Sequence, residues 1–157
     1  MQARIRRLNA DYAGICAAFA ENSRIRLVSA EGNPPDKYIF EFQVLGLVPL
    51  GEDSFEQGSL HRAEIFLPID YPRRPPFCRM VTPVFHPNID PQKICIGDHW
   101  SAGQSLTQLI TRVAEMISYQ SYNVKSPLNA RAAAWAEQNI SALPLEKTDL
   151  TAPVSAA

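Results

Sequence analysis

The sequence predicts an α+β domain, in which an N-terminal helix precedes a four-stranded antiparallel meander sheet and further helices follow an irregular loop. Apolar residues near the N-terminus recur every three or four positions, the next segments alternate with a period of two, and a helical period returns after residue 105. Strands joined by short connections form antiparallel meanders. We expect a single domain over residues 1–147 and a flexible tail over residues 148–157.

A stripe of apolar side chains predicts the first helix. Its members are Ile5, Leu8, Tyr12, Ile15 and Phe19. Cys16 lies beside this stripe, and we interpret it as a small core residue. The side chains of Arg4, Arg6 and Arg7 fall mostly off the stripe. They are expected to form either a solvated basic face or a docking surface for an acidic partner.

Alternating segments predict four strands, at residues 24–30, 38–44, 60–67 and 77–81. In the second segment, Tyr38 and Phe40 belong to one face of the strand and Glu41 belongs to the other. Residues 46–58, with a glycine at each end, are predicted to form a loop between the second and third strands.

Residues 81–96 are predicted to form an irregular but rigid loop. Pro83, Pro87 and Pro91 exclude a central strand or a helix, and seven of the 13 prolines in the chain fall between residues 68 and 91. Apolar residues should anchor the loop to the body of the domain; they are Val81, Val84, Phe85, Ile89, Ile94 and Ile96. A rigid loop of this length is commonly functional.

Two helices are predicted after the loop. Ser105 and Gln108 have the spacing of a capping box, and an apolar stripe over residues 106–117 follows. Asn129 is expected to cap a further helix whose inward side chains are Ala132, Ala133, Ala136, Ile140 and Leu143.

The composition excludes several classes of protein. A formal net charge of −1 argues against a nucleic-acid binder or a polybasic membrane binder. No stretch approaches the roughly 20 apolar residues of a transmembrane helix. The three cysteines, Cys16, Cys78 and Cys95, are too widely spaced for a CxxC zinc site or a disulfide framework. We therefore expect a soluble, cytoplasmic protein with reduced thiols.

The candidate catalytic residues lie in and just after the irregular loop. Cys95 follows His86 and Asn88 closely, and His99 lies just beyond it. A cysteine nucleophile requires thiolate character, and a reaction at a carbonyl requires a fixed donor for the oxyanion. Cys95 and the amide of Asn88 are candidates for these two roles.

Several motifs around these residues resemble those of the ubiquitin-conjugating enzymes. They are YPRRPP at residues 71–76, FHPNI at 85–89, IC at 94–95, WS at 100–101 and SPLNARAA at 126–133. The resemblance extends over roughly residues 4–146 and follows the order of elements in that family.

The resemblance implies that Cys95 accepts a ubiquitin-like modifier as a thioester and transfers it to a lysine of a protein substrate. The chain itself would need no cofactor, because a separate activating enzyme uses the ATP. Asn88 would stabilise the oxyanion or hold the loop. His86 would bond the backbone of the loop rather than act as a base. Ser126 would orient the incoming lysine or serve only as a turn residue.

The resemblance also bears on partners. It implies that an activating enzyme docks on the N-terminal helix, through Arg4, Arg6 and Arg7. The spacing from Asn88 to Cys95 is one residue shorter than is common in the family, and Arg73 replaces an aromatic contact for ligases. These departures leave the use of a ligase open. They suit a divergent branch, such as the bacterial ubiquitin-like conjugation systems that act in antiviral defence.

The sequence leaves two other classes of function open. One is a binding module that has the same fold but no catalysis. The other is a hydrolase in which Cys95 acts with His86 or His99, or a zinc site built from the same residues. The cysteine in register after the HPN motif argues against the binding module, and the lack of an identifiable orienting carboxylate or amide argues against the hydrolase.

Overall fold

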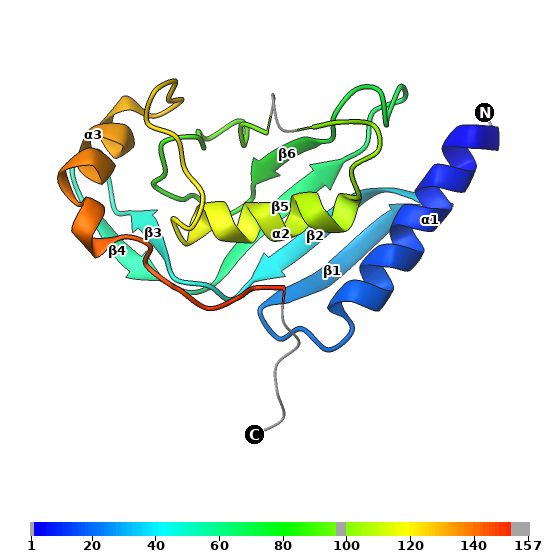
Figure 1. Cartoon of the computed structure of the whole chain (residues 1–157), viewed down its shortest axis with the longest axis horizontal. Coiled ribbons are helices and arrows are strands. Elements are labelled where there is room, and N and C mark those ends of the chain that lie inside the picture. The colour runs from blue at the N-terminus through cyan, green and yellow to red at the C-terminus, as the bar shows by residue number, and fades with distance from the viewer. Residues whose placement is uncertain (1, 97–99, 152–157) are drawn as a thin grey trace.

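The computed structural model describes residues 2–96 and 100–151. Its centre is an antiparallel sheet in the order β1–β2–β5–β6, crossed on one face by α2 (Figure 1). Helix α1 lies beside β1, and α3 lies at the opposite end of the molecule (Figure 1). The strands are β1 (Ile25–Gly32), β2 (Pro35–Phe42), β5 (His61–Phe66) and β6 (Phe77–Met80). The helices are α1 (Gln2–Phe19), α2 (Leu106–Ile117), α3 (Ala130–Gln138) and the 3₁₀ turn η2 (Ile140–Ala142). The predicted α+β meander is confirmed.

Strand alternation separates a buried face of the sheet from an open one. Tyr38 pairs with Ile65 and Phe40 pairs with Ala63, and all four are fully buried beneath the helices. On the open face the carboxylate of Glu41 bonds two guanidinium groups, those of Arg26 and Arg62. These bonds lower the pKa of Glu41. The sheet thus has one apolar face and one face covered by cross-strand ion pairs.

Residues 46–58 form a hairpin, so the prediction of a loop was wrong. Strands β3 (Gly46–Pro49) and β4 (Phe55–Gly58) pair in a separate two-stranded sheet. Each strand has only four residues, which is too short for a clear alternation in the sequence. Gly46 is required by space, because a Cβ there would lie 2.7 Å from Ile117 Cγ2 and 2.9 Å from His61 Nε2.

Helix α1 buries a narrower stripe than the sequence predicted. Leu8, Ile15 and Phe19 enter the core, whereas Ile5 and Tyr12 remain partly exposed. The interpretation of Cys16 as a core residue was wrong, because its side chain is exposed. The helix packs along a single line of residues, and a position next to that line already faces solvent. Cys78 is buried, which raises the pKa of its thiol.

The helix caps follow the predictions. The Ser105 hydroxyl accepts from the Gln108 backbone N–H at 3.1 Å, and the Gln108 side chain accepts from the Ser105 N–H at 3.3 Å. Asn129 caps α3 by accepting from the Ala132 N–H at 3.0 Å. The inward placement of Ile140 was wrong: α3 ends at Gln138, and the following turn leaves Ile140 63% exposed.

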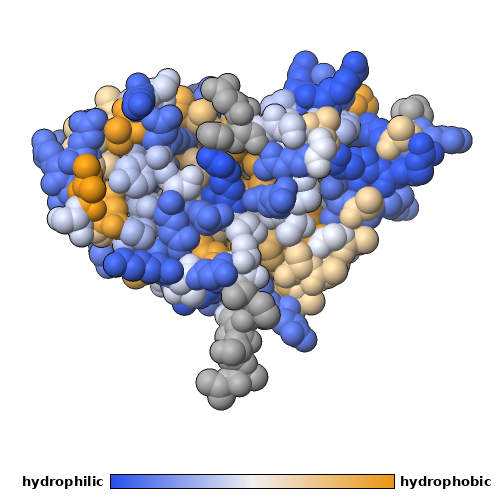
Figure 2. All heavy atoms as spheres, viewed as in Figure 1, coloured by the Kyte–Doolittle hydropathy of each residue, from blue (hydrophilic) through white to orange (hydrophobic). Residues whose placement is uncertain are grey.

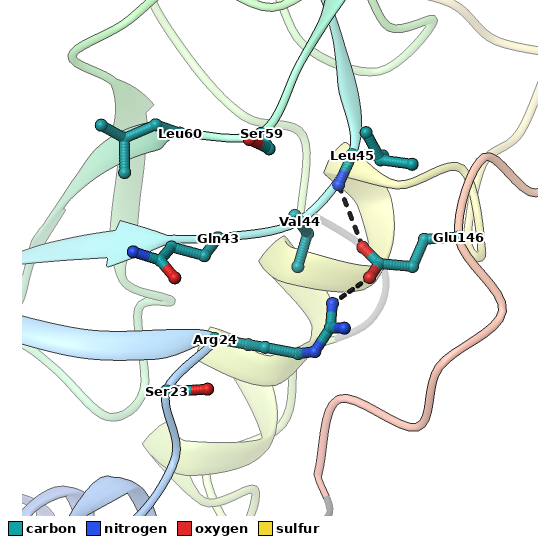
Figure 3. A pocket seen from close by; sticks show the side chains of 8 residues that line it. All are labelled: Ser23, Arg24, Gln43, Val44, Leu45, Ser59, Leu60 and Glu146. Atoms are coloured by element: carbon teal, nitrogen blue, oxygen red, sulfur yellow. Dashed lines mark hydrogen bonds and ion pairs between the residues drawn. The ribbon is translucent and has the colours of Figure 1, made fainter. Parts of the chain in front are cut away.

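The C-terminal segment is packed farther than predicted. Glu146 bonds the Arg24 guanidinium, and its other oxygen accepts from the Leu45 N–H at 3.0 Å (Figure 3). Leu150 is only 2% exposed, and its carbonyl accepts from the Asn22 side chain at 3.0 Å. The frayed tail expected from residue 148 is therefore ordered as far as Leu150, and residues 152–157 lie outside the described residues.

The surface is polar over most of the face that carries α2. Figure 2 shows this face as largely hydrophilic, with apolar side chains gathered in small separate patches. No helix within residues 2–96 and 100–151 is long and apolar enough to cross a membrane.

Candidate functional site

Cys95 lies exposed between two buried neighbours. Ile94 and Ile96 are 3% and 5% exposed and belong to the main core cluster. The Ile94 N–H donates to the Cys78 carbonyl at 2.8 Å, and the Cys95 N–H donates to the Asn88 carbonyl at 2.9 Å. The flanking side chains and backbone bonds thus fix an irregular stretch of chain and present its thiol to solvent.

His86 is buried, and both of its ring nitrogens bond to backbone groups. Its Nδ1 accepts from the Asn88 N–H at 3.0 Å, and its Nε2 lies 3.2 Å from the Ser121 carbonyl. This pairing requires a neutral ring with its proton on Nε2. Burial lowers the pKa of His86 to about 4, which keeps the ring neutral at pH 7. The ring therefore braces the loop and has no free nitrogen for a proton transfer at Cys95.

The side chain of Asn88 forms a closed pair with the backbone of Asn123. Its Nδ2 donates to the Asn123 carbonyl, and its Oδ1 accepts from the Asn123 N–H, both at 2.8 Å. Asn88 is 8% exposed, so these bonds are largely shielded from water. The pair fixes the orientation of the amide, and one hydrogen of Nδ2 remains outside it.

Tyr119 shapes the segment that receives His86 and Asn88, and this role was not predicted from the sequence. Its φ of +61° lies in the left-handed region, where it ends α2 and redirects the chain into residues 120–123. Its ring packs 4.8 Å from the His86 ring, and its hydroxyl donates to the Phe85 carbonyl at 2.6 Å. These contacts compensate for the strained backbone.

Ser126 is exposed near the same loop. Two N–H groups just after it, those of Leu128 and Asn129, donate to the Pro87 carbonyl at 2.8 and 3.0 Å. These bonds bring the segment that carries Ser126 next to the HPN motif. Within the described part of the chain, the Ser126 hydroxyl itself takes part in no hydrogen bond.

The geometry gives little support to the alternatives of a hydrolase and a zinc site. His86 is occupied by the backbone, as described above, and His99 lies outside the described residues. No group of three His, Cys, Asp or Glu side chains within residues 2–96 and 100–151 is placed to hold a metal ion.

The arginines of α1 do not form the uniform basic face that the sequence allowed. Arg4 donates to the carbonyls of Leu67 and Pro68, each at 3.2 Å. Arg7 donates to Asp11 Oδ2 at 3.0 Å and to the Tyr71 hydroxyl at 3.1 Å. Both side chains thus tie the helix to neighbouring loops.

Arg7 also ties α1 to the chain just after the site. Its guanidinium donates to the carbonyls of Ala102 and Gln104, at 2.5 and 2.7 Å. Arg6, in contrast, is exposed, and it is the arginine of the three that the fold leaves available for a partner.

Comparison with known proteins agrees with this arrangement. A family model described as "Ubiquitin-conjugating enzyme" matches residues 9–146. Ubiquitin-conjugating enzyme E2 15 of Schizosaccharomyces pombe is 30% identical over 142 residues, which cover 74% of this chain and 83% of the relative. SUMO-conjugating enzyme UBC9 of Caenorhabditis elegans is 28% identical over 91 residues, 54% of each protein.

Solved structures show the same fold. The E2 domain of a ubiquitin conjugating enzyme from Toxoplasma gondii gives a TM-score of 0.57 at 24% identity and covers 90% of both chains. A Trypanosoma cruzi protein described as a ubiquitin conjugating enzyme gives a TM-score of 0.63 at 20% identity, covering 86% of this chain and 90% of the other.

Proposed function

The chain belongs to the ubiquitin-conjugating enzyme family, and we propose that it carries a ubiquitin-like modifier as a thioester on Cys95 and transfers it to a lysine. The observation that supports this most directly is an exposed thiol held between buried residues on a loop braced by hydrogen bonds. A carrier cysteine must be reachable by two large partners in turn, and this geometry permits that.

The first step is a transthiolation. The Cys95 thiolate attacks the carbonyl carbon of the thioester that joins the modifier to its activating enzyme. A new carbon–sulfur bond forms at Cys95, and the thiolate of the activating enzyme leaves. ATP is consumed earlier by that enzyme, so this chain requires no cofactor of its own. We propose that α1 is the docking element and that Arg6 is its exposed basic contact.

The second step is an aminolysis. A neutral lysine amine attacks the thioester carbonyl, the carbon–nitrogen bond of an isopeptide forms, and the Cys95 thiolate leaves. The proton of the attacking nitrogen passes to solvent base, because His86 has no free nitrogen to accept it. In this proposal the Asn88 amide donates its remaining N–H to the oxyanion while the Asn123 pair keeps it in place. Ser126, on the neighbouring exposed segment, orients the lysine.

The test uses the purified chain with two pairs of activating enzyme and modifier, one pair for ubiquitin and one for SUMO, with ATP. One pair should form an adduct that thiol reagents cleave. Cys95→Ala should form none, and Cys95→Ser should form an adduct that thiol reagents leave intact. Cys16→Ala is the matched control, because Cys16 is also exposed but lies on α1. No adduct with either pair, or an adduct that survives in Cys95→Ala, would overturn the proposal.

A further inference from the structure

We propose that Gln120 is a positioning residue for transfer to lysine, because it ties the segment that orients the Asn88 amide to the C-terminal end of the fold. That segment, residues 118–123, is the bridging segment, and the irregular residues 145–150 are the C-terminal strap. In Figure 1 the strap runs along the lower edge of the view, from the side of α3 towards the start of β1. The proposal rests on the function proposed above and adds to it a residue that acts through its neighbours.

The C-terminal strap is anchored at both of its ends. The Glu146 carboxylate bonds the Arg24 guanidinium and accepts from the Leu45 N–H at 3.0 Å (Figure 3). At the other end Leu150 belongs to the main core cluster, and its carbonyl accepts from the Asn22 side chain at 3.0 Å. The strap therefore has a fixed position although its backbone is irregular.

Gln120 uses both hydrogens of its side-chain amide to bond the strap. Its Nε2 donates to the carbonyls of Glu146 and Thr148, each at 2.9 Å. The Leu145 N–H adds a third bond from the strap, to the Ser118 carbonyl at 2.9 Å. Two of the three bonds thus depend on a single side chain, which makes their role accessible to substitution.

The same bridging segment holds the candidate site. Ser121 directly follows Gln120, and its carbonyl lies 3.2 Å from His86 Nε2. Asn123 makes both bonds to the side chain of Asn88, at 2.8 Å. Contacts to the strap and contacts to the site therefore share one short stretch of backbone, so a shift at Gln120 is passed to the amide of Asn88.

The bridging segment needs this support because its backbone is strained. Tyr119, immediately before Gln120, has a φ of +61°, and a residue in the left-handed region keeps that conformation only where its surroundings hold it. The accuracy required is high, since a displacement of about 1 Å in a catalytic group lowers a rate by up to roughly 100-fold. We expect the loss of the Gln120 bonds to cost part of that range.

Two substitutions remove the bonds of Gln120 to different degrees. Gln120→Met keeps an unbranched side chain without the donors, and Gln120→Glu also sets a carboxylate against two carbonyl oxygens. Single-turnover transfer from the Cys95 thioester to free lysine should fall about threefold in the first and about tenfold in the second. Loading from the activating enzyme should change by under about twofold, because the Asn88 amide is assigned to the oxyanion of the aminolysis. Gln57→Glu makes the same change at an exposed position on β4 and should alter neither rate.

Amide hydrogen exchange of the unloaded chain separates positioning from stability. The Asn123 N–H donates to Asn88 Oδ1, so its exchange reports on that pair directly. In Gln120→Glu this N–H should exchange about tenfold faster, while the amides of β2 and β5 keep their rates. A general loss of stability would instead accelerate exchange in the sheet as well.

A double-mutant cycle tests whether the effect passes through the strap. Glu146→Ala removes the bonds to Arg24 and Leu45 but keeps the backbone carbonyl that accepts from Gln120. Transfer should fall about threefold in Glu146→Ala, and adding Gln120→Met should slow it little further, since both changes break one connection. Effects that multiply in full would show that Gln120 acts independently of the strap, which overturns the proposal.

The remaining outcomes distinguish this proposal from the proposed function. Unchanged exchange at Asn123, or an equal loss in loading and transfer for Gln120→Glu, overturns the positioning role while the proposed function stands. If Gln120→Glu does not fold, Gln120→Met decides by the same two measurements, with exchange at Asn123 expected to rise about threefold. An unaltered chain that forms no thioester counts against the proposed function, and the positioning role falls with it.

Discussion

Two buried polar clusters anchor the loops of this protein, and they are built from different chemistry. The N-terminal cluster consists of Arg7, Asp11 and Tyr71, in which an ion pair at 3.0 Å and a hydroxyl–carboxylate bond at 2.5 Å join α1 to the YPRRPP segment. The loop cluster consists of His86, Asn88 and residues 121–123, and all of its bonds join neutral groups.

This difference in charge reflects the surroundings of each cluster. A buried ion pair holds two elements together but leaves an uncompensated charge if either partner is removed. Under the proposed function, Cys95 becomes a thiolate and then carries an acyl group, so a fixed charge beside it would bias each step. A neutral imidazole and a neutral amide fix the geometry there without adding charge. We therefore expect damage to the N-terminal cluster to affect stability, and damage to the loop cluster to affect reactivity.

The largest expected effect is on the loop cluster. Asn88→Ala removes the proposed oxyanion donor, and transfer from the Cys95 thioester to lysine should fall about 100-fold in single-turnover assays. Loading from the activating enzyme should fall less, by under tenfold. Asn123→Ala should cost under threefold, because Asn88 bonds only the backbone of Asn123.

An equal loss in loading and transfer for Asn88→Ala would show that the amide holds the loop without contacting the oxyanion. The loop cluster would then only hold its loop in place, and the expected difference between the two clusters would disappear. Urea unfolding of the variant must accompany the kinetics, so that a loss of folded protein is not read as a loss of rate.

The next effect belongs to the N-terminal cluster. Arg7→Ala leaves the Asp11 carboxylate buried with only the Tyr71 hydroxyl and breaks two bonds to backbone carbonyls. The free energy of unfolding should fall by about 3 kcal/mol in urea titrations. Arg6→Ala, at the neighbouring exposed position, should stay within about 0.5 kcal/mol of the unaltered chain. A loss below about 1 kcal/mol for Arg7→Ala would remove the distinction between the clusters.

A third prediction concerns the pH dependence of stability that the loop cluster confers. Burial holds the pKa of His86 at about 4, against an ordinary value of 6.5. The unfolded chain therefore binds a proton that the folded chain does not, and stability falls as the pH falls from 6.5 toward 4. Between pH 7 and pH 5 the contribution of His86 amounts to about 2 kcal/mol.

The measurement compares urea unfolding of the unaltered chain and of His86→Gln at pH 7 and pH 5. The unaltered chain should lose about 2 kcal/mol more than the variant. His61 is also buried with a lowered pKa, and it bonds the carbonyls of Val44 and Gly58, so His61→Gln should also reduce the loss of stability at low pH. Parallel pH curves for His86→Gln and the unaltered chain would contradict the structural role of the ring.

The sequence predicted the fold well where one period continued over many residues. The sheet strands and the α2 capping box follow from alternation and local spacing, which act within a few residues. The four-residue strands β3 and β4 are too short for such a signal, and their pairing depends on packing against His61 and Ile117. Packing also determines the exposure of Cys16, because the width of the buried stripe on α1 depends on neighbouring elements.

The candidate site was predictable only in part for the same reason. Its loop residues are adjacent in sequence and carry recognisable motifs. Their bonding partners, Ser121 and Asn123, lie 35 residues away from His86 and Asn88, in a segment without periodicity. The turn at Tyr119 that brings this segment into place uses a residue type that rarely adopts a positive φ, so no local rule indicates it.

The smallest expected effect concerns Ser126, which lies next to the loop cluster without joining it. Backbone bonds to Pro87 hold its segment, and these do not depend on the serine side chain. Ser126→Ala should therefore leave the free energy of unfolding within about 0.5 kcal/mol and slow transfer to lysine by no more than about threefold. The informative measurement is the lysine concentration that gives half-maximal transfer, because an orienting hydroxyl acts on the attacking amine alone. A higher half-maximal concentration with an unchanged loading rate would assign the hydroxyl to the amine. A transfer loss as large as that of Asn88→Ala would instead make Ser126 a functional member of the loop cluster.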